Sequence, residues 1–245
     1  MAIAHQTELQ GASNSVAGNY DTVFTPAAAL NGVVVIIINS TSVSDVVTSV
    51  SYGISTGAVA LARAASPYGF ATEATEPGGV FIYWGGDSTV WPSGAQTVRI
   101  VRTGTDNIRC LISSMTVAAG QVVSLDSGAT GTSASVANPA WTHASLVNNV
   151  VAYLGIHSGL QTMTTTPATN WTLQGTAEDV GNVGRGWARR TLATAGALAP
   201  GWTAATADDF VGSSIAFQEA AAPAASLGPP WRAPARRRPI HLVRR

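Results

Sequence analysis

The sequence predicts an all-β fold, a jelly-roll-like antiparallel β-sandwich followed by an extended C-terminal arm. The strongest signal is a run of six β-branched residues, Val33 to Ile38. The run is too short to span a membrane and too stiff at χ1 to favour a helix. Elsewhere, short strand patterns alternate with Gly and Pro turns, and no convincing amphipathic helix occurs. Among β-sandwiches, the jelly roll fits this length and strand number best.

The run from Val33 to Ile38 is predicted to be a central strand that is buried on both faces, because every position is apolar. The strand after it, residues 46–52, has the alternating pattern of a half-buried strand. In that alternation Thr48 shares the inner face with Val50 and Tyr52. We therefore expect one central and one outer strand of a layered fold.

The rest of the body continues the same pattern. Two weaker strands are expected within residues 4–24, and the later ones at 58–64, 80–84, 96–102, 108–117, 121–125, 146–156, 171–175, 186–192, 202–205 and 212–218. The stretch 146–156 resembles the first buried run, and 171–175 resembles the outer strand that follows that run. This weak similarity indicates two Greek-key halves of one sandwich rather than two domains.

The chain divides into three parts: a sandwich domain over residues 1–218, an Ala/Pro linker over 219–230 and an Arg-rich arm over 231–245. Their charges differ sharply. Residues 1–222 hold seven arginines and all thirteen acids, a net charge of −6, whereas residues 223–245 hold six arginines and no acid, a net charge of +6. The formal net charge of zero therefore hides a basic tail on an acidic body.

The basic arm is the clearest candidate binding segment. Its arginines alternate with prolines and apolar residues, which suits an extended segment docked on an acidic protein surface. A disordered solubility tail and the binding of nucleic-acid phosphates are weaker alternatives. The predicted partner-binding residues are Trp231, Arg232, Arg236, Arg237, Arg238, Ile240, Leu242, Arg244 and Arg245.

Signatures of catalysis and of metal binding are mostly absent from the sequence. It has no nucleophile elbow, P-loop, dinucleotide-binding or zinc-protease motif. His143 and His157 could meet in space, but structural histidines are the favoured interpretation. The acidic pairs at 178–179 and 208–209 lack calcium-loop spacing. We expect no cofactor, no metal and no enzymatic activity.

Composition adds two further expectations. The single cysteine, Cys110, excludes an intramolecular disulfide and a multi-cysteine metal site. The N-terminal residues lack the basic and apolar regions of a signal peptide, and no apolar run has the length of a membrane span. The sequence therefore predicts no association with membranes.

Seven tryptophans raise the possibility of sugar binding, since exposed aromatic faces stack on sugar rings. Most are expected to be packing residues. Trp91 and Trp202 stand beside Pro and Gly in predicted loops, so they are the candidates for contact with a glycan.

The order of a VVVIII strand, a VTSVSYG strand, a VFIYW strand and a QTVRIVRTG strand, then a second similar half, resembles the small jelly-roll proteins of tailed-bacteriophage virions. The likeness covers residues 4–218 and brings no catalytic residue. It implies a capsid decoration or minor tail protein that is assembled in the host cytoplasm and exposed on the particle. The implied partners are capsid or tail subunits and copies of itself. A carbohydrate-binding module for adhesion to the host is the alternative function.

Overall fold

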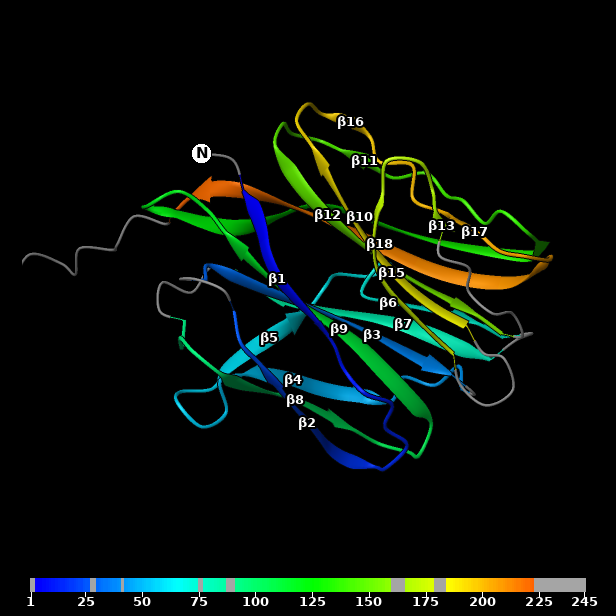
Figure 1. The fold of residues 1–245 in the computed structure, drawn as a ribbon, viewed down its shortest axis with the longest axis horizontal. Coiled ribbons are helices and arrows are strands. Elements are labelled where there is room, and N and C mark those ends of the chain that lie inside the picture. The colour runs from blue at the N-terminus through cyan, green and yellow to red at the C-terminus, as the bar shows by residue number, and fades with distance from the viewer. Residues whose placement is uncertain are drawn as a thin grey trace, which may run out of the picture.

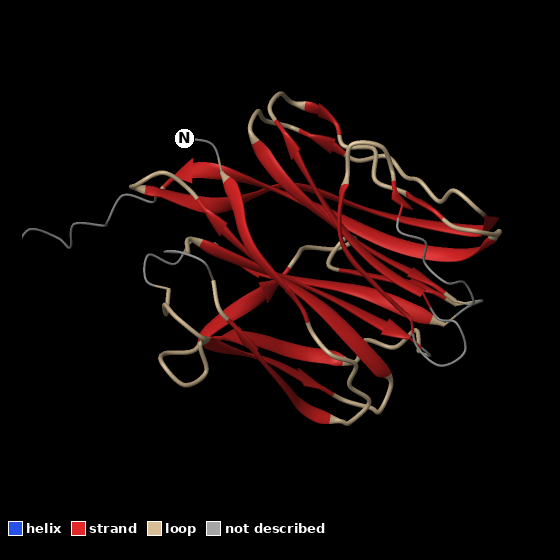
Figure 2. Ribbon diagram, viewed as in Figure 1, coloured by secondary structure: helices blue, strands red, loops and turns tan. Residues whose placement is uncertain are grey.

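The computed structural model describes residues 3–26, 30–40, 42–74, 77–86, 91–159, 166–178 and 184–222. Within these residues the chain forms strands, turns and loops but no helix (Figure 2). All pairings between strands are antiparallel. The prediction of an all-β antiparallel sandwich is confirmed.

The described residues form eighteen strands, numbered in chain order. They are β1 (Ala4–Gln10), β2 (Gly18–Phe24), β3 (Gly32–Ser40), β4 (Val47–Tyr52), β5 (Val59–Arg63), β6 (Phe70–Glu73), β7 (Gly78–Gly85), β8 (Gln96–Arg102), β9 (Asn107–Thr116), β10 (Gln121–Val136), β11 (Ala144–Ser145), β12 (Val150–Ser158), β13 (Thr166–Pro167), β14 (Thr172–Glu178), β15 (Gly184–Leu192), β16 (Gly196–Ala197), β17 (Trp202–Thr203) and β18 (Asp208–Ala221).

The strands form two large sheets. The first has the order β1-β9-β3-β7-β5-β4-β8-β2, with β6 also paired to β7, and the second has the order β10-β18-β12-β15-β14. The first sheet curls at β5, so that β4, β8 and β2 lie below β9, β3 and β7 in Figure 1, while the second sheet lies above them. The body is therefore a stack of three β-layers.

Apolar side chains fill both spaces between these layers. Val35 and Ile37 of β3 belong to the core between the two halves of the curled first sheet. Ile36 and Ile38 belong to the core between β3 and the second sheet. Because β3 lies in the middle layer, all nine of its residues are buried, as the uniform apolar run predicts. Each such side chain contributes about 1.5–3 kcal/mol by burial.

The far face of the second sheet carries a third core. Val150, Ala152, Leu154 and Ile156 of β12 face this side, and the loops around the two-residue strands β11, β13, β16 and β17 cover them. Strand β12 is therefore also buried on both faces. The predicted likeness of residues 146–156 to the first buried run has a structural counterpart over residues 150–156, which lie in the central strand β12. Residues 146–149 precede the strand, and Leu146 is exposed.

One detail of the predicted outer strand is corrected. A β-bulge between Val47 and Ser49 interrupts the pairing of β4 with β8. The extra residue shifts the alternation, so Val47 is buried and Thr48 is exposed. Val50 and Tyr52 lie beyond the bulge and keep the predicted inward orientation.

The last described strand continues past the expected end of the domain. Strand β18 runs to Ala221, and its final residues pair with Gln121, Val122 and Val123 of β10. The first residues assigned to the linker therefore extend the second sheet. The remainder of the linker and the whole arm lie outside the described residues. Among the described residues, no helix has the length and apolar character needed to cross a lipid bilayer.

Candidate functional site

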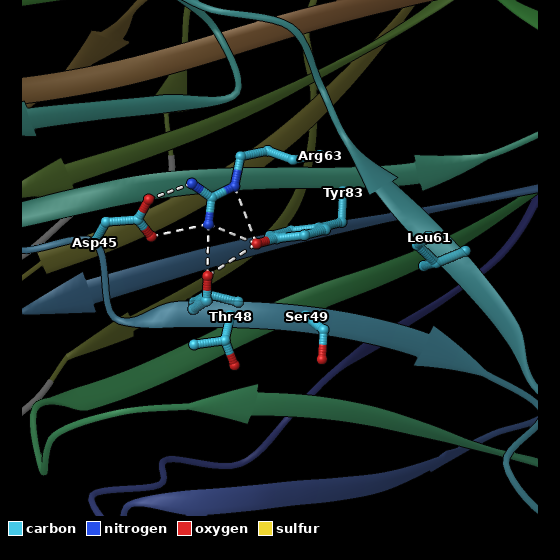
Figure 3. Close-up of a pocket in the computed structure, with 7 residues that line it drawn as sticks. Asp45, Thr48, Ser49, Leu61, Arg63 and Tyr83 are labelled. Atoms are coloured by element: carbon cyan, nitrogen blue, oxygen red, sulfur yellow. Dashed lines mark hydrogen bonds and ion pairs between the residues drawn. The ribbon is translucent and has the colours of Figure 1, made fainter.

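An open pocket of about 600 Å³ lies at the point where the first sheet curls (Figure 3). Its walls come from four neighbouring segments of the chain. They contribute Asp45 from the loop before β4, Val47, Thr48 and Ser49 from β4, Leu61 and Arg63 from β5, and Tyr83 from β7.

The path of β5 creates this pocket. Strand β5 first pairs with residues 50–52 of β4, and then its last residues, Ala62 and Arg63, pair with β7. The strand thus crosses from one layer to the next, and residues 47–49 of β4 have no partner strand on that side among the described residues. The bulge in β4 falls at the same place. A hollow remains between the separating strands.

The side chain of Arg63 forms hydrogen bonds with three other residues that line the pocket. Its guanidinium forms an ion pair with Asp45, with one nitrogen 2.8 Å from Oδ1. The same group donates to the Tyr83 hydroxyl from Nε at 3.0 Å and from Nη2 at 2.6 Å, and to the carbonyl of Val47 at 2.5 Å. Tyr83 in turn donates to that carbonyl at 3.0 Å. Figure 3 shows the guanidinium held between Asp45 and Tyr83.

The electrostatics of this network favour a fixed cation. The hydrogen bonds that Arg63 donates to Asp45 raise the pKa of Arg63, while burial lowers it and Tyr83 raises it further. Burial raises the pKa of Tyr83, while the guanidinium acts in the opposite direction. Tyr83 thus stays a neutral hydroxyl near neutral pH. The pocket offers a charged pair and hydroxyl groups beside the apolar side chain of Leu61, a combination suited to holding a polar ligand.

A second hollow of about 240 Å³ adjoins the first and shares Arg63 with it. Ala64, Ser66, Gly69 and Phe70 complete its lining. The ring of Phe70 is stacked on that of the buried Phe81, with centroids 4.5 Å apart. Arg63 therefore lines both hollows.

The two tryptophans predicted to contact a glycan differ in their exposure. Trp202 is only 2% exposed, and its ring lies in the third core against Gly186. That burial leaves no open face for a sugar, which counts against its predicted role. Trp91 is half-buried and packs edge-to-face on Tyr52, with centroids 5.6 Å apart. The structure does not bring Trp91 and Trp202 together, because they belong to different cores.

The histidines with a possible shared role do not meet. His143 is buried on the outer side of the second sheet, where Ser127 and Ser214 lie 3.1 and 2.8 Å from its two ring nitrogens. His157 is buried on the opposite side, against Gly78 of β7. The second sheet separates them, so the two rings do not form a joint site.

Both residues of the acidic pair at 208–209 accept hydrogen bonds from other parts of the chain. Asp208 accepts a hydrogen bond from the Ser158 hydroxyl, and Asp209 accepts one from the backbone amide of Ser135 at 2.7 Å. Within the described ranges, no cluster of three or more His, Cys, Asp or Glu side chains has the arrangement of a metal site. Asp179 lies outside the described residues.

The predicted partner-binding residues, Trp231 through Arg245, all lie outside the described residues. The pocket at Arg63, in contrast, was missed by the sequence interpretation. Its signal was available, because Arg63 follows Leu61 by two residues in an alternating strand and so occupies a position on the inner face. A charged residue at such a position indicates a specific partner or a functional site.

The chain was also compared with known proteins. No protein-family model and no curated protein matches it.

Proposed function

We propose that this chain is a structural protein of a virion, displayed on the particle exterior and anchored in part by its basic C-terminal segment. The observation that carries the proposal is the division of charge between a layered β-body and the segment attached to it. The body holds every acid of the chain, and all the excess positive charge begins after β18 ends at Ala221. An acidic body and a basic segment on one chain suit docking between neighbouring subunits.

The position of the chain ends in the body supports this role. Ala4, at the start of β1, pairs with Thr116, and Ala221, at the end of β18, pairs with Gln121. Both therefore lie beside the short connection between β9 and β10 (Figure 1). The basic segment is attached at this one end, which leaves the other end of the rigid body for display.

Deleting residues 223–245 tests the anchor. We expect the truncated protein to fold with an unchanged melting temperature, because β18 remains complete, but to be lost from purified particles. A full-length variant with its six tail arginines changed to glutamine separates charge from length, and we expect it to be lost as well. Quantitative mass spectrometry of particles measures the incorporation. If both variants are incorporated at the wild-type level, the basic segment does not anchor the protein to the particle.

Glycan binding is a second candidate function, and the pocket at Arg63 is the observation that favours it. Carboxylate, guanidinium and hydroxyl groups can each hydrogen-bond to sugar hydroxyls, and Asp45, Arg63 and Ser49 bring these groups to one open hollow. The pocket is a better site than Trp202, whose ring is covered.

A glycan array with wild-type protein and the Asp45→Asn and Ser49→Ala variants tests this second function. We expect a specific hit that weakens at least tenfold in Asp45→Asn, since a lost charge-assisted hydrogen bond costs about 1.5–3 kcal/mol, and by a smaller factor of about two- to tenfold in Ser49→Ala, which loses a neutral hydrogen bond of about 0.5–1.5 kcal/mol. Trp202→Phe is the control for stability alone, because its ring is away from the pocket. If the wild type binds no glycan specifically, glycan binding is rejected and the structural role is the one proposal that remains.

A further inference from the structure

Among the described residues, five strands of the large sheets have no partner strand along the whole of one side: β1, β2 and β6 in the first sheet, and β10 and β14 in the second. An exposed edge presents unpaired N–H and C=O groups and is a template for pairing with another chain. Natural proteins usually blunt such edges with bulges, short strands, lysine or proline. The five edges can therefore be compared for these protective features.

Four of the five edges are protected. Bulges interrupt β1 between His5 and Glu8, β14 between Leu173 and Gly175, and β10 at two places. Strand β6 is only four residues long. Strand β2 differs from these bulged or short strands, because all seven of its residues pair with β8 in unbroken register. Strand β10 also keeps its register over seven residues, Ser127–Ser133, but a bulge bounds that stretch at each end. Among the described strands, β2 is the one edge of more than four residues that is regular along its whole length.

The free edge of β2 carries a regular series of backbone groups. The carbonyl of Thr97 in β8 accepts a hydrogen bond from the amide of Gly53, so the backbone groups of Thr97 point toward β4. Val23 lies opposite Thr97 on the other side of β8. Because N–H and C=O of one residue point the same way, the groups of Val23 face outward, as do those of Asp21 and Asn19 by alternation.

The side chains along this edge suit an apolar contact. Val23 is 62% exposed, and Val16, just before the strand, is 66% exposed. The one acid, Asp21, is paired with Arg99 of β8 through two hydrogen bonds of 2.7 and 2.6 Å. The hydrogen bonds from Arg99 lower the pKa of Asp21, so the pair is charged but locally neutral. The charge of Asp21 is thus compensated within its own subunit.

We propose that β2 pairs antiparallel with β2 of a second copy of this chain, with Thr22 on the two-fold axis. The identical partner follows from self-complementarity, because a two-fold axis perpendicular to the sheet places each outward amide opposite an outward carbonyl. This register sets Asp21 opposite Val23 of the partner. A register centred on Asp21 would instead oppose two carboxylates, which is unfavourable.

The side chains on the inner face of β2 favour the same register, with Thr22 on the two-fold axis. Tyr20 and Phe24 are the buried residues of β2 and belong to the first core. With Thr22 on the axis, Tyr20 of one copy lies opposite Phe24 of the other, and aromatic cross-strand pairs of this kind are favourable. The cores of the two subunits would then be continuous. This inference holds whether or not the chain is part of a virion.

Sedimentation equilibrium of the full chain tests the proposal. We expect a concentration-dependent dimer of twice the 25.0 kDa chain mass, and at least a tenfold weaker association for Val23→Lys. Val23→Pro should have the same effect, since it removes an amide that β8 does not use. The matched control is Leu146→Lys, which places the same charge at another exposed apolar residue, 74% exposed and outside the first sheet.

Disulfide cross-linking tests the position of the proposed two-fold axis. Thr22→Cys should cross-link to itself under mild oxidation, because non-hydrogen-bonded neighbours in an antiparallel pair lie close enough for a disulfide. Leu146→Cys is the control for random collision, and the buried Cys110 is common to all variants. A monomeric wild type, or association that Val23→Lys leaves unchanged, would overturn the proposal. So would cross-linking of Thr22→Cys no faster than that of Leu146→Cys.

Discussion

At the scale of single residues, the interior of this protein holds several polar groups that are kept neutral. Burial lowers the pKa of His143 to about 4, although nearby Asp126 acts in the opposite direction. Burial, with a contribution from Arg189, also lowers the pKa of His5 to about 4. Both rings are neutral in the folded protein near pH 7. The neutral ring of His143 lies within hydrogen-bond distance of the hydroxyls of Ser127 and Ser214.

This neutrality predicts sensitivity to acid. The unfolded chain protonates His143 near pH 6.5, whereas the folded protein resists protonation until about pH 4, so stability falls as the pH is lowered between these values. We expect a loss of about 2–3 kcal/mol from this residue between pH 7 and pH 4.5. Urea unfolding at the two pH values measures it, and His143→Gln should show a smaller loss, with His5 still contributing. An equal loss in the variant would contradict the assignment.

In the pocket at Arg63, a single side chain connects several of the lining residues through its hydrogen bonds. Its guanidinium joins the loop before β4 to β7, through Asp45 and Tyr83, beside the bulge in β4. An exposed ion pair alone contributes little to stability. The shared hydrogen bonds with Tyr83 and the carbonyl of Val47 fix its geometry, and this fixed geometry is what would serve recognition of a ligand.

At the scale of elements, the molecule is organised around β3, whose side chains alternate between two cores. Ile36 and Ile37 are adjacent, chemically identical and completely buried, yet they face different layers. This arrangement distinguishes a three-layer stack from a two-layer sandwich with one face in solvent. It also explains why the run lacks the polar alternation of the other strands.

The substitutions Ile36→Ala and Ile37→Ala test the arrangement. Each should lower the free energy of unfolding by about 2–5 kcal/mol, because each leaves a cavity in a packed core. Val23→Ala, at an exposed position of β2, should change it by less than about 0.5 kcal/mol. Chemical denaturation of the three variants gives the comparison. A small effect at either isoleucine would mean that one of the two layers does not pack on β3.

At the scale of the whole molecule, the second sheet is completed by the residues just before the basic segment. Glu219 accepts a hydrogen bond from the amide of Ala118 at 2.9 Å, and its neighbours pair with the start of β10. The body thus includes residues whose composition suggested a linker. The border between the body and the basic segment lies after Ala221 rather than after Gln218.

Two truncations test this border. A chain ending at Ala222 should be as stable as the full chain, whereas a chain ending at Gln218 should lose about 1–3 kcal/mol, because the amide of Ala118 and the first residues of β10 lose their partners. Thermal unfolding followed by circular dichroism measures both. Equal stability of the two truncations would show that residues 219–222 contribute nothing to the sheet.

The sequence by itself determined the fold class and the central strands, because burial on both faces demands uniformly apolar runs, and such runs stand out at Val33 and Val150. Tertiary structure decided the rest. The bulge that exposes Thr48, the curl that makes three layers and the pocket around Arg63 all depend on which strands pair and where the pairing slips. Strand pairing joins residues that are far apart in the chain, so it cannot be predicted from the local pattern of apolar and polar residues.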